Sequence, residues 1–196
     1  RAPAECALIA VTLAALVALR PLFDTWTYLP RLVVVALAAH LTVVGARSLR
    51  LRLPLTGLLT AAGFLLTTAW LFLASTTWYG LPTAASWQAA GHDLADGWSR
   101  FQTVVAPAQP TTGFLLATTV AVWLAAFVAD WAAFRLWTPF EAIVPTAGLV
   151  LFAAVLGADE HSIGGAVAYL AVALAFFLLH RAYRQERAAR WVGSGT

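Results

Sequence analysis

Residues 111–156, "TTGFLLATTVAVWLAAFVADWAAFRLWTPFEAIVPTAGLVLFAAVL", contain two long apolar runs joined by a short charged segment. Each run approaches the roughly 20 mostly apolar residues that an α-helix needs to cross a bilayer. The segment between them, "DWAAFRLWTPFE" (130–141), carries an Asp, an Arg and a Glu. The stretch therefore predicts a membrane helical hairpin. It also raises the question of whether these charges only turn the chain or act within the membrane.

The rest of the chain has a similar composition. Of its 196 residues, 61% are hydrophobic and 11% are charged, whereas soluble domains carry about 25% charged residues. A soluble fold of this length could not bury so many apolar side chains, so we expect an integral membrane protein. The predicted fold is all-α: a polytopic membrane bundle of six transmembrane helices, forming a single domain over residues 1–196. The predicted spans are roughly 3–20, 29–46, 55–74, 111–131, 139–156 and 163–180.

The arginines predict the orientation of these spans. All 12 basic residues are Arg, and nine of them fall on one side of the predicted topology, chiefly in "RSLRLR" (47–52) and "RAYRQERAAR" (181–190). Loops rich in Arg stay in the cytoplasm. We therefore expect a multi-pass protein of a bacterial plasma membrane with both termini cytoplasmic. The net charge of +3 does not indicate a nucleic-acid partner, because the arginines cluster at membrane edges.

The one long loop, which would be external, contains a predicted amphipathic helix at about 84–104. Four apolar side chains, Trp87, Leu94, Trp98 and Phe101, recur at steps that place them on one helical face. Thr83 can cap the start of this helix, and two prolines follow its end. The helix could be a substrate lid or a docking surface. Alternatively, it lies flat on the outer leaflet or across the mouth of the bundle.

The charged segment at 130–141 first predicts a tight turn. Thr138 and Glu141 have the spacing of a capping box, with Pro139 at the first helical position. Arg135 would mark the inner membrane interface at the end of the fourth span, where a cation suits both the helix dipole and the lipid headgroups. Thus Arg135, Thr138 and Glu141 are expected to serve as turn and capping residues.

Asp130 lies more than one helical turn inside Arg135. An ionised Asp within a span costs about 3 kcal/mol and usually has a partner. His40 in the second span lies at a similar depth, so His40 and Asp130 form a candidate intramembrane polar pair. The pair could hold helices together, or it could carry protons.

No pattern in the sequence indicates catalysis. Cys6 is the only cysteine, and no Cys/His spacing typical of zinc is present. Metalloprotease, serine-hydrolase and phosphate-loop motifs are also missing. We therefore predict no catalytic, cofactor-binding or metal-binding residues, and no enzyme activity for this chain by itself.

Several stretches together resemble the amino-terminal membrane domain of bacterial transglutaminase-like membrane proteins, especially the actinobacterial branch. These stretches are "LFDTWTYLP" (22–30), "TTWYGLPT" (76–83), "FQTVVAP" (101–107), "FVADWAAFRLWTPFEAIVP" (127–145) and "LGADEH" (156–161). The resemblance covers nearly the whole chain and implies a fragment of a longer protein. In that family an extracytoplasmic domain with a Cys-His-Asp triad follows the membrane domain. No triad residue can be assigned in this chain, because its only cysteine lies in the first span.

Two functions follow as expectations. In the first, the chain is a membrane anchor and scaffold that presents, and can regulate, its own carboxy-terminal transglutaminase-like domain, with a MoxR-type ATPase system as a further partner implied by the resemblance. In the second, the chain transports protons or a small substrate and uses His40 and Asp130. The sequence that follows residue 196 would discriminate between them.

Overall fold

The computed structural model describes residues 2–157 and 162–193, and shows the predicted helical membrane bundle. Six helices are long and apolar enough to cross a membrane. Five of them, α1 (Ala2–Ala18), α2 (Tyr28–Ser48), α3 (Leu53–Phe72), α5 (Thr112–Trp131) and α6 (Pro139–Leu156), lie within about two residues of the predicted spans. The sixth, α7, runs over Ser162–Gly193 and is longer than predicted. Residues 158–161, between α6 and α7, lie outside the described residues.

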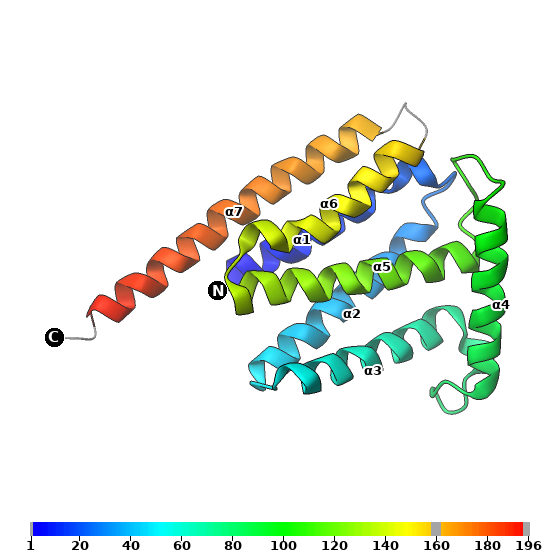
Figure 1. The fold of residues 1–196 in the computed structure, drawn as a ribbon, viewed down its shortest axis with the longest axis horizontal. Coiled ribbons are helices and arrows are strands. Elements are labelled where there is room, and N and C mark those ends of the chain that lie inside the picture. Colours follow the sequence, from blue (N-terminus) through cyan, green and yellow to red (C-terminus); the bar gives the residue numbers. More distant parts are fainter. Residues whose placement is uncertain (1, 158–161, 194–196) are drawn as a thin grey trace.

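The added length of α7 comes from the arginine-rich segment after residue 180. That segment was expected to be a cytoplasmic tail, but its backbone continues as helix to Gly193. The cause is local, because Ala, Arg, Gln and Glu are good helix formers and no Gly or Pro interrupts the sequence from 166 to 192. Figure 1 shows α7 extending beyond the other spans at the end where α1 begins.

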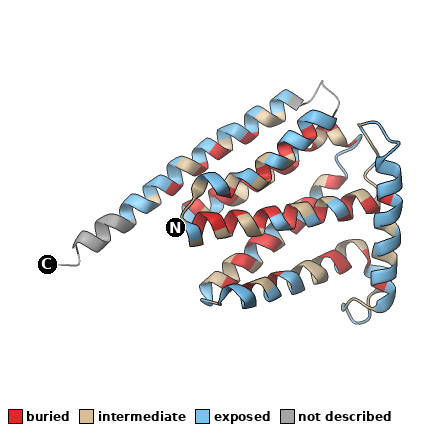
Figure 2. Cartoon of the chain, in the orientation of Figure 1, coloured by how far each residue is buried: buried red, intermediate tan, exposed pale blue. Residues whose placement is uncertain are grey.

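The core of the bundle is centred on α5. This helix contacts α1, α2, α3, α4 and α6. Figure 2 shows buried positions concentrated along α1, α2 and α5, whereas α3, α6 and α7 are buried mainly on one face. The exposed apolar side chains of these outer helices, such as Leu58, Leu151 and Leu170, are in keeping with a lipid environment, where they would contact acyl chains rather than water.

The predicted amphipathic helix is present as α4 (Ala84–Phe101), which runs across the ends of α3 and α5 (Figure 1). It starts where predicted, with Thr83 as the N-cap, and the Thr83 backbone N–H donates to Ser86 Oγ at 3.0 Å. It ends three residues early, in a segment with β-branched residues at 103–105 that disfavours helix.

The apolar face of α4 contacts the bundle only in part, and all four of its side chains remain exposed. Phe101 stacks on Phe152 of α6 with ring centroids 6.4 Å apart, and Trp87 and Leu94 line a groove with α3 and α5. The closest packing, however, involves a glycine rather than this face. Gly97 is buried against Gly113 at the start of α5, where an added Cβ would lie 3.0 Å from the Gly113 carbonyl carbon.

We predict that Gly97→Ala destabilises the docking of α4, because backbone atoms cannot yield to the new methyl group. Overpacking of this kind typically costs about 1–3 kcal/mol. The matched control is Gly91→Ala on the same helix, where an added Cβ has nothing within 4 Å and should stabilise by up to about 1 kcal/mol. Thermal unfolding in detergent should separate the two variants. Equal stabilisation by both would show that α4 is not packed as described.

Candidate functional site

The candidate site is an ionic cluster formed by Glu5 of α1, Arg47 of α2 and Asp130 of α5. Arg47 donates from Nη1 to Asp130 Oδ1 at 2.6 Å, and from Nη2 to Glu5 Oε1. The side chain of Asp130 is 1% exposed, that of Arg47 is 10% exposed and that of Glu5 is 19% exposed. One guanidinium group therefore joins three helices that are distant in the sequence.

Arginine is suited to this position because its planar guanidinium presents several donors in a fixed geometry. The two terminal nitrogens serve two carboxylates on different helices, which a lysine ammonium could not do with the same directionality. The guanidinium also lies over the ring of Phe134, with Cζ 4.3 Å from the ring centroid. A cation over an aromatic face gains electrostatic attraction, and more so where water is excluded. The cluster thus compensates buried charge by ion pairs and by a cation–π contact.

The predicted partner of Asp130 must be corrected. Asp130 is buried and paired, as expected, but it forms its ion pair with Arg47, whereas the ring of His40 bonds Thr12 of α1 at 2.9 Å. Arg47 lies seven residues after His40, two turns along the same face of α2. The sequence pattern predicts a loop at Arg47, because the predicted second span ends at residue 46. In the structure α2 continues to Ser48 and therefore includes Arg47. An ionised carboxylate is better matched by a permanent cation than by a neutral imidazole.

The predicted capping box at Thr138 and Glu141 is also wrong. Helix α6 begins at Pro139 as predicted, but Thr138 makes no side-chain cap hydrogen bond. Its backbone N–H, which Glu141 was expected to satisfy, donates instead to the carbonyl of Ala132 at 3.0 Å, and Glu141 is exposed. The reason is the wide turn that ends the preceding helix.

That turn is a π-helical segment, η3 (Ala132–Leu136), which follows α5 directly. It is closed by Trp137, which adopts a left-handed conformation with φ 63° and ψ 28°. This conformation is an outlier for a bulky residue and costs of the order of 1–3 kcal/mol. Packing against α7 offsets the cost: Trp137 stacks on Tyr183 with centroids 5.9 Å apart, and His180 Nε2 bonds the Ala133 carbonyl at 2.9 Å. Nothing in the sequence pattern indicated this turn.

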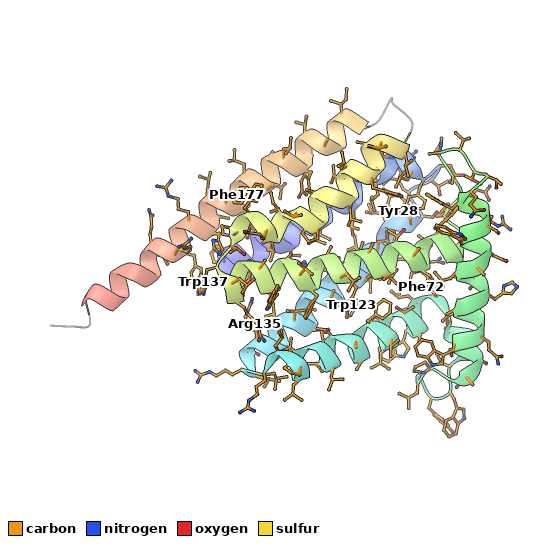
Figure 3. The ribbon with its side chains drawn as sticks, in the orientation of Figure 1. Tyr28, Phe72, Trp123, Arg135, Trp137 and Phe177 are labelled. Atoms are coloured by element: carbon orange, nitrogen blue, oxygen red, sulfur yellow. The ribbon has the colours of Figure 1, made fainter. Side chains whose placement is uncertain are left out.

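Arg135 has a more specific role than marking the interface. From η3 it donates through Nη2 to Thr56 Oγ1 at 2.9 Å and to the Leu51 carbonyl at 3.2 Å. It therefore ties the end of α5 to the start of α3. Figure 3 shows Arg135 and Trp137 at the same end of the bundle.

The chemistry available to this arrangement is structural. Both carboxylates are engaged by the same guanidinium group. Within residues 2–157 and 162–193, no group of three or more His, Cys, Asp or Glu side chains is arranged to hold a metal ion. The cluster can fix helices in place, and a change in its pairing would alter how they pack.

We predict that Asp130→Ala destabilises the bundle by about 3–5 kcal/mol, because it leaves Arg47, whose side chain is only 10% exposed, without one of its two carboxylates. Glu141→Ala is the matched control: its carboxylate lies near the same end of the bundle but is exposed, so the loss should stay within about 0.5 kcal/mol. Unfolding by denaturant in mixed micelles measures both. Similar losses for the two variants would contradict the assignment of Asp130 to a buried ion pair.

No family model matches this chain, and neither a curated protein nor a solved structure matches it. The membrane-bundle architecture therefore rests on the chain's own helices, and the role of the ionic cluster rests on its geometry. The resemblance to transglutaminase-like membrane proteins remains an expectation from short stretches of sequence.

Proposed function

We propose that this chain is a membrane anchor and scaffold that presents an extracytoplasmic transglutaminase-like domain. The observation that carries the proposal is the ionic cluster, in which one buried and two partly buried charges bind helices to one another. Glu5, Arg47 and Asp130 connect α1, α2 and α5, which are the helices with the most buried positions (Figure 2). The three residues lie in the first turn of α1 and the last turns of α2 and α5, so the cluster ties these helices together at one end of the bundle. A bundle tied in this way is suited to holding an attached domain in a constant position.

Further polar contacts extend this connection to the outer spans. Arg135 ties α5 to α3 through Thr56. Tyr169 of α7 bonds Thr146 of α6 at 2.9 Å and donates to the Ile143 carbonyl at 3.0 Å. Each contact satisfies polar groups that would otherwise be costly in lipid. Together they favour a rigid platform over helices that slide past one another.

The proposal also includes the orientation of the bundle in the membrane. The start of α1 and the end of α7 lie at the end of the bundle that carries Arg135, whereas α4 lies at the other end (Figures 1 and 3). With arginine-rich loops in the cytoplasm, both termini are cytoplasmic and α4 is external. The attached domain would follow a further span, and a MoxR-type ATPase system is a partner that the resemblance implies.

The transporter alternative uses His40 and Asp130 as a pair of proton carriers. Each of these side chains has a different partner, Thr12 for His40 and Arg47 for Asp130. Proton transfer between them would first require the ion pair of Asp130 to open. The free energy needed to open this ion pair favours the scaffold function over proton transport.

The proposal predicts that the parent polypeptide carries its enzyme domain on the outer surface of the membrane. Protease added to intact spheroplasts should release a soluble domain with Cys, His and Asp in its active site. The spans described above should stay in the membrane, as mass spectrometry of both fractions would show. If no such domain is released or encoded, the scaffold proposal fails.

A second experiment tests the transporter alternative directly. The purified spans in liposomes with an internal pH dye should dissipate a pH gradient no faster than empty liposomes. Proton flux that is lost in both His40→Ala and Asp130→Asn would favour the transporter.

The orientation predicts opposite labelling of two engineered cysteines in a Cys6→Ala background, which removes the only native thiol. A membrane-impermeant maleimide added to intact cells should label Asp96→Cys in α4, which is exposed. It should label Arg50→Cys, between α2 and α3, only after the membrane is permeabilised. Labelling of Arg50→Cys in intact cells would reverse the proposed topology.

A further inference from the structure

A groove of about 130 Å³ lies beneath α4, between α3 and α5. Its walls are mostly apolar and include Phe64 and Leu65 of α3, Leu116 and Val120 of α5, and Trp87 of α4. Val120 and Trp87 are 39% and 58% exposed, so the groove opens at the surface of the bundle. On a helix that spans a membrane, that surface is covered by lipid.

The dimensions of the groove follow the direction of the spans. On the α3 side its lining runs from Leu73, just after the helix, inward to Phe64, and on α5 from Leu116 to Val120. At 1.5 Å per residue these walls are about 13 Å and about 6 Å long. A slot with this orientation, closed at its outer end by α4, fits a segment of an acyl chain of the adjacent leaflet.

Two hydroxyl side chains, Ser86 and Thr68, also line the groove. The Ser86 hydroxyl donates to the carbonyl of Thr76 at 2.9 Å. Thr68, in contrast, is 9% exposed, and its Oγ1 is buried without a hydrogen-bond partner among the described residues. Of the two, only the Thr68 hydroxyl lacks a hydrogen-bond partner within the described residues.

Thr68 is placed at a depth that suits a lipid. It lies four residues before the end of α3 at Phe72, about 6 Å of helix inside the outer interface. Threonine in a helix has two accessible χ1 rotamers, so the hydroxyl can turn toward the groove without movement of the backbone. The ester carbonyls of glycerolipids lie just inside the headgroup layer, close to this depth.

We infer that the groove binds one acyl chain of a glycerolipid, with Thr68 donating a hydrogen bond to its ester carbonyl. The apolar walls hold the chain by van der Waals contacts. The hydroxyl selects for an ester over an ether. Lipid binding in this groove does not require the attached domain, so the two proposals stand or fall separately.

Two lipid probes test the inference on the unmodified protein. Dipalmitoyl phosphatidylglycerol has ester carbonyls, and its dihexadecyl diether analogue has none. Native mass spectrometry of the protein in detergent, titrated with each lipid, should show about fivefold tighter retention of the diester, the effect of one neutral hydrogen bond. Equal retention of both lipids would overturn the ester contact, and would indicate that Thr68 bonds within its own helix.

Three variants then locate the contact. Thr68→Val should abolish the preference for the diester, whereas Thr67→Val, the neighbouring threonine outside the groove, should preserve it. Val120→Phe should fill the opening and weaken retention of both lipids. Unchanged retention in Val120→Phe would overturn the groove as the binding site. If Thr68→Val does not fold, the comparison of the two lipids on the unmodified protein still decides the outcome.

Discussion

The fold depends on the requirement that charge placed inside a membrane must be compensated by the protein. The side chain of Asp130 is 1% exposed, so its carboxylate must be compensated by groups of the protein. The necessary cation comes from Arg47, which is 83 residues away in sequence and at the last turn of α2. Glu5 binds the same guanidinium. The register of α1, α2 and α5 is thus fixed at one level, because a shift of one turn in any of them would separate a charged group from its partner.

The other helices are positioned relative to α1, α2 and α5 by single polar contacts and by close backbone packing. Arg135 and Thr56 connect α5 to α3, while Gly97 and Gly113 allow α4 to approach α5. The π-helical turn after α5 is the least regular of these connections. It directs Arg135 toward α3, while the Ala133 carbonyl and Trp137 contact His180 and Tyr183 of α7. One turn therefore connects α5 with both α3 and α7.

The spans could be predicted from the sequence because membrane thickness imposes a length and hydropathy that need no tertiary information. Helix α6 occupies 139–156 as predicted, and α4 begins behind Thr83. The burial of Asp130 could also be predicted, since its depth follows from the length of α5. Its partner could not, because depth alone left several candidates, and a two-residue error at the end of α2 removed Arg47 from consideration. The capping box failed for a related reason: the residue pattern at 138–141 was suitable, but a wide turn that no local pattern indicates already used the Thr138 N–H.

A double-mutant cycle on Arg47 and Asp130 tests most directly whether this ion pair holds the bundle together. Arg47→Met, Asp130→Leu and the double variant would be unfolded in mixed micelles at equilibrium, beside the exposed pair His92 and Asp96 of α4 as a reference. A buried pair predicts that the double variant is more stable than the sum of the single losses implies, with a coupling free energy of at least about 2 kcal/mol. The reference pair should show a coupling close to zero. Additive losses for Arg47 and Asp130 would contradict the claim that their interaction holds the three central helices in register.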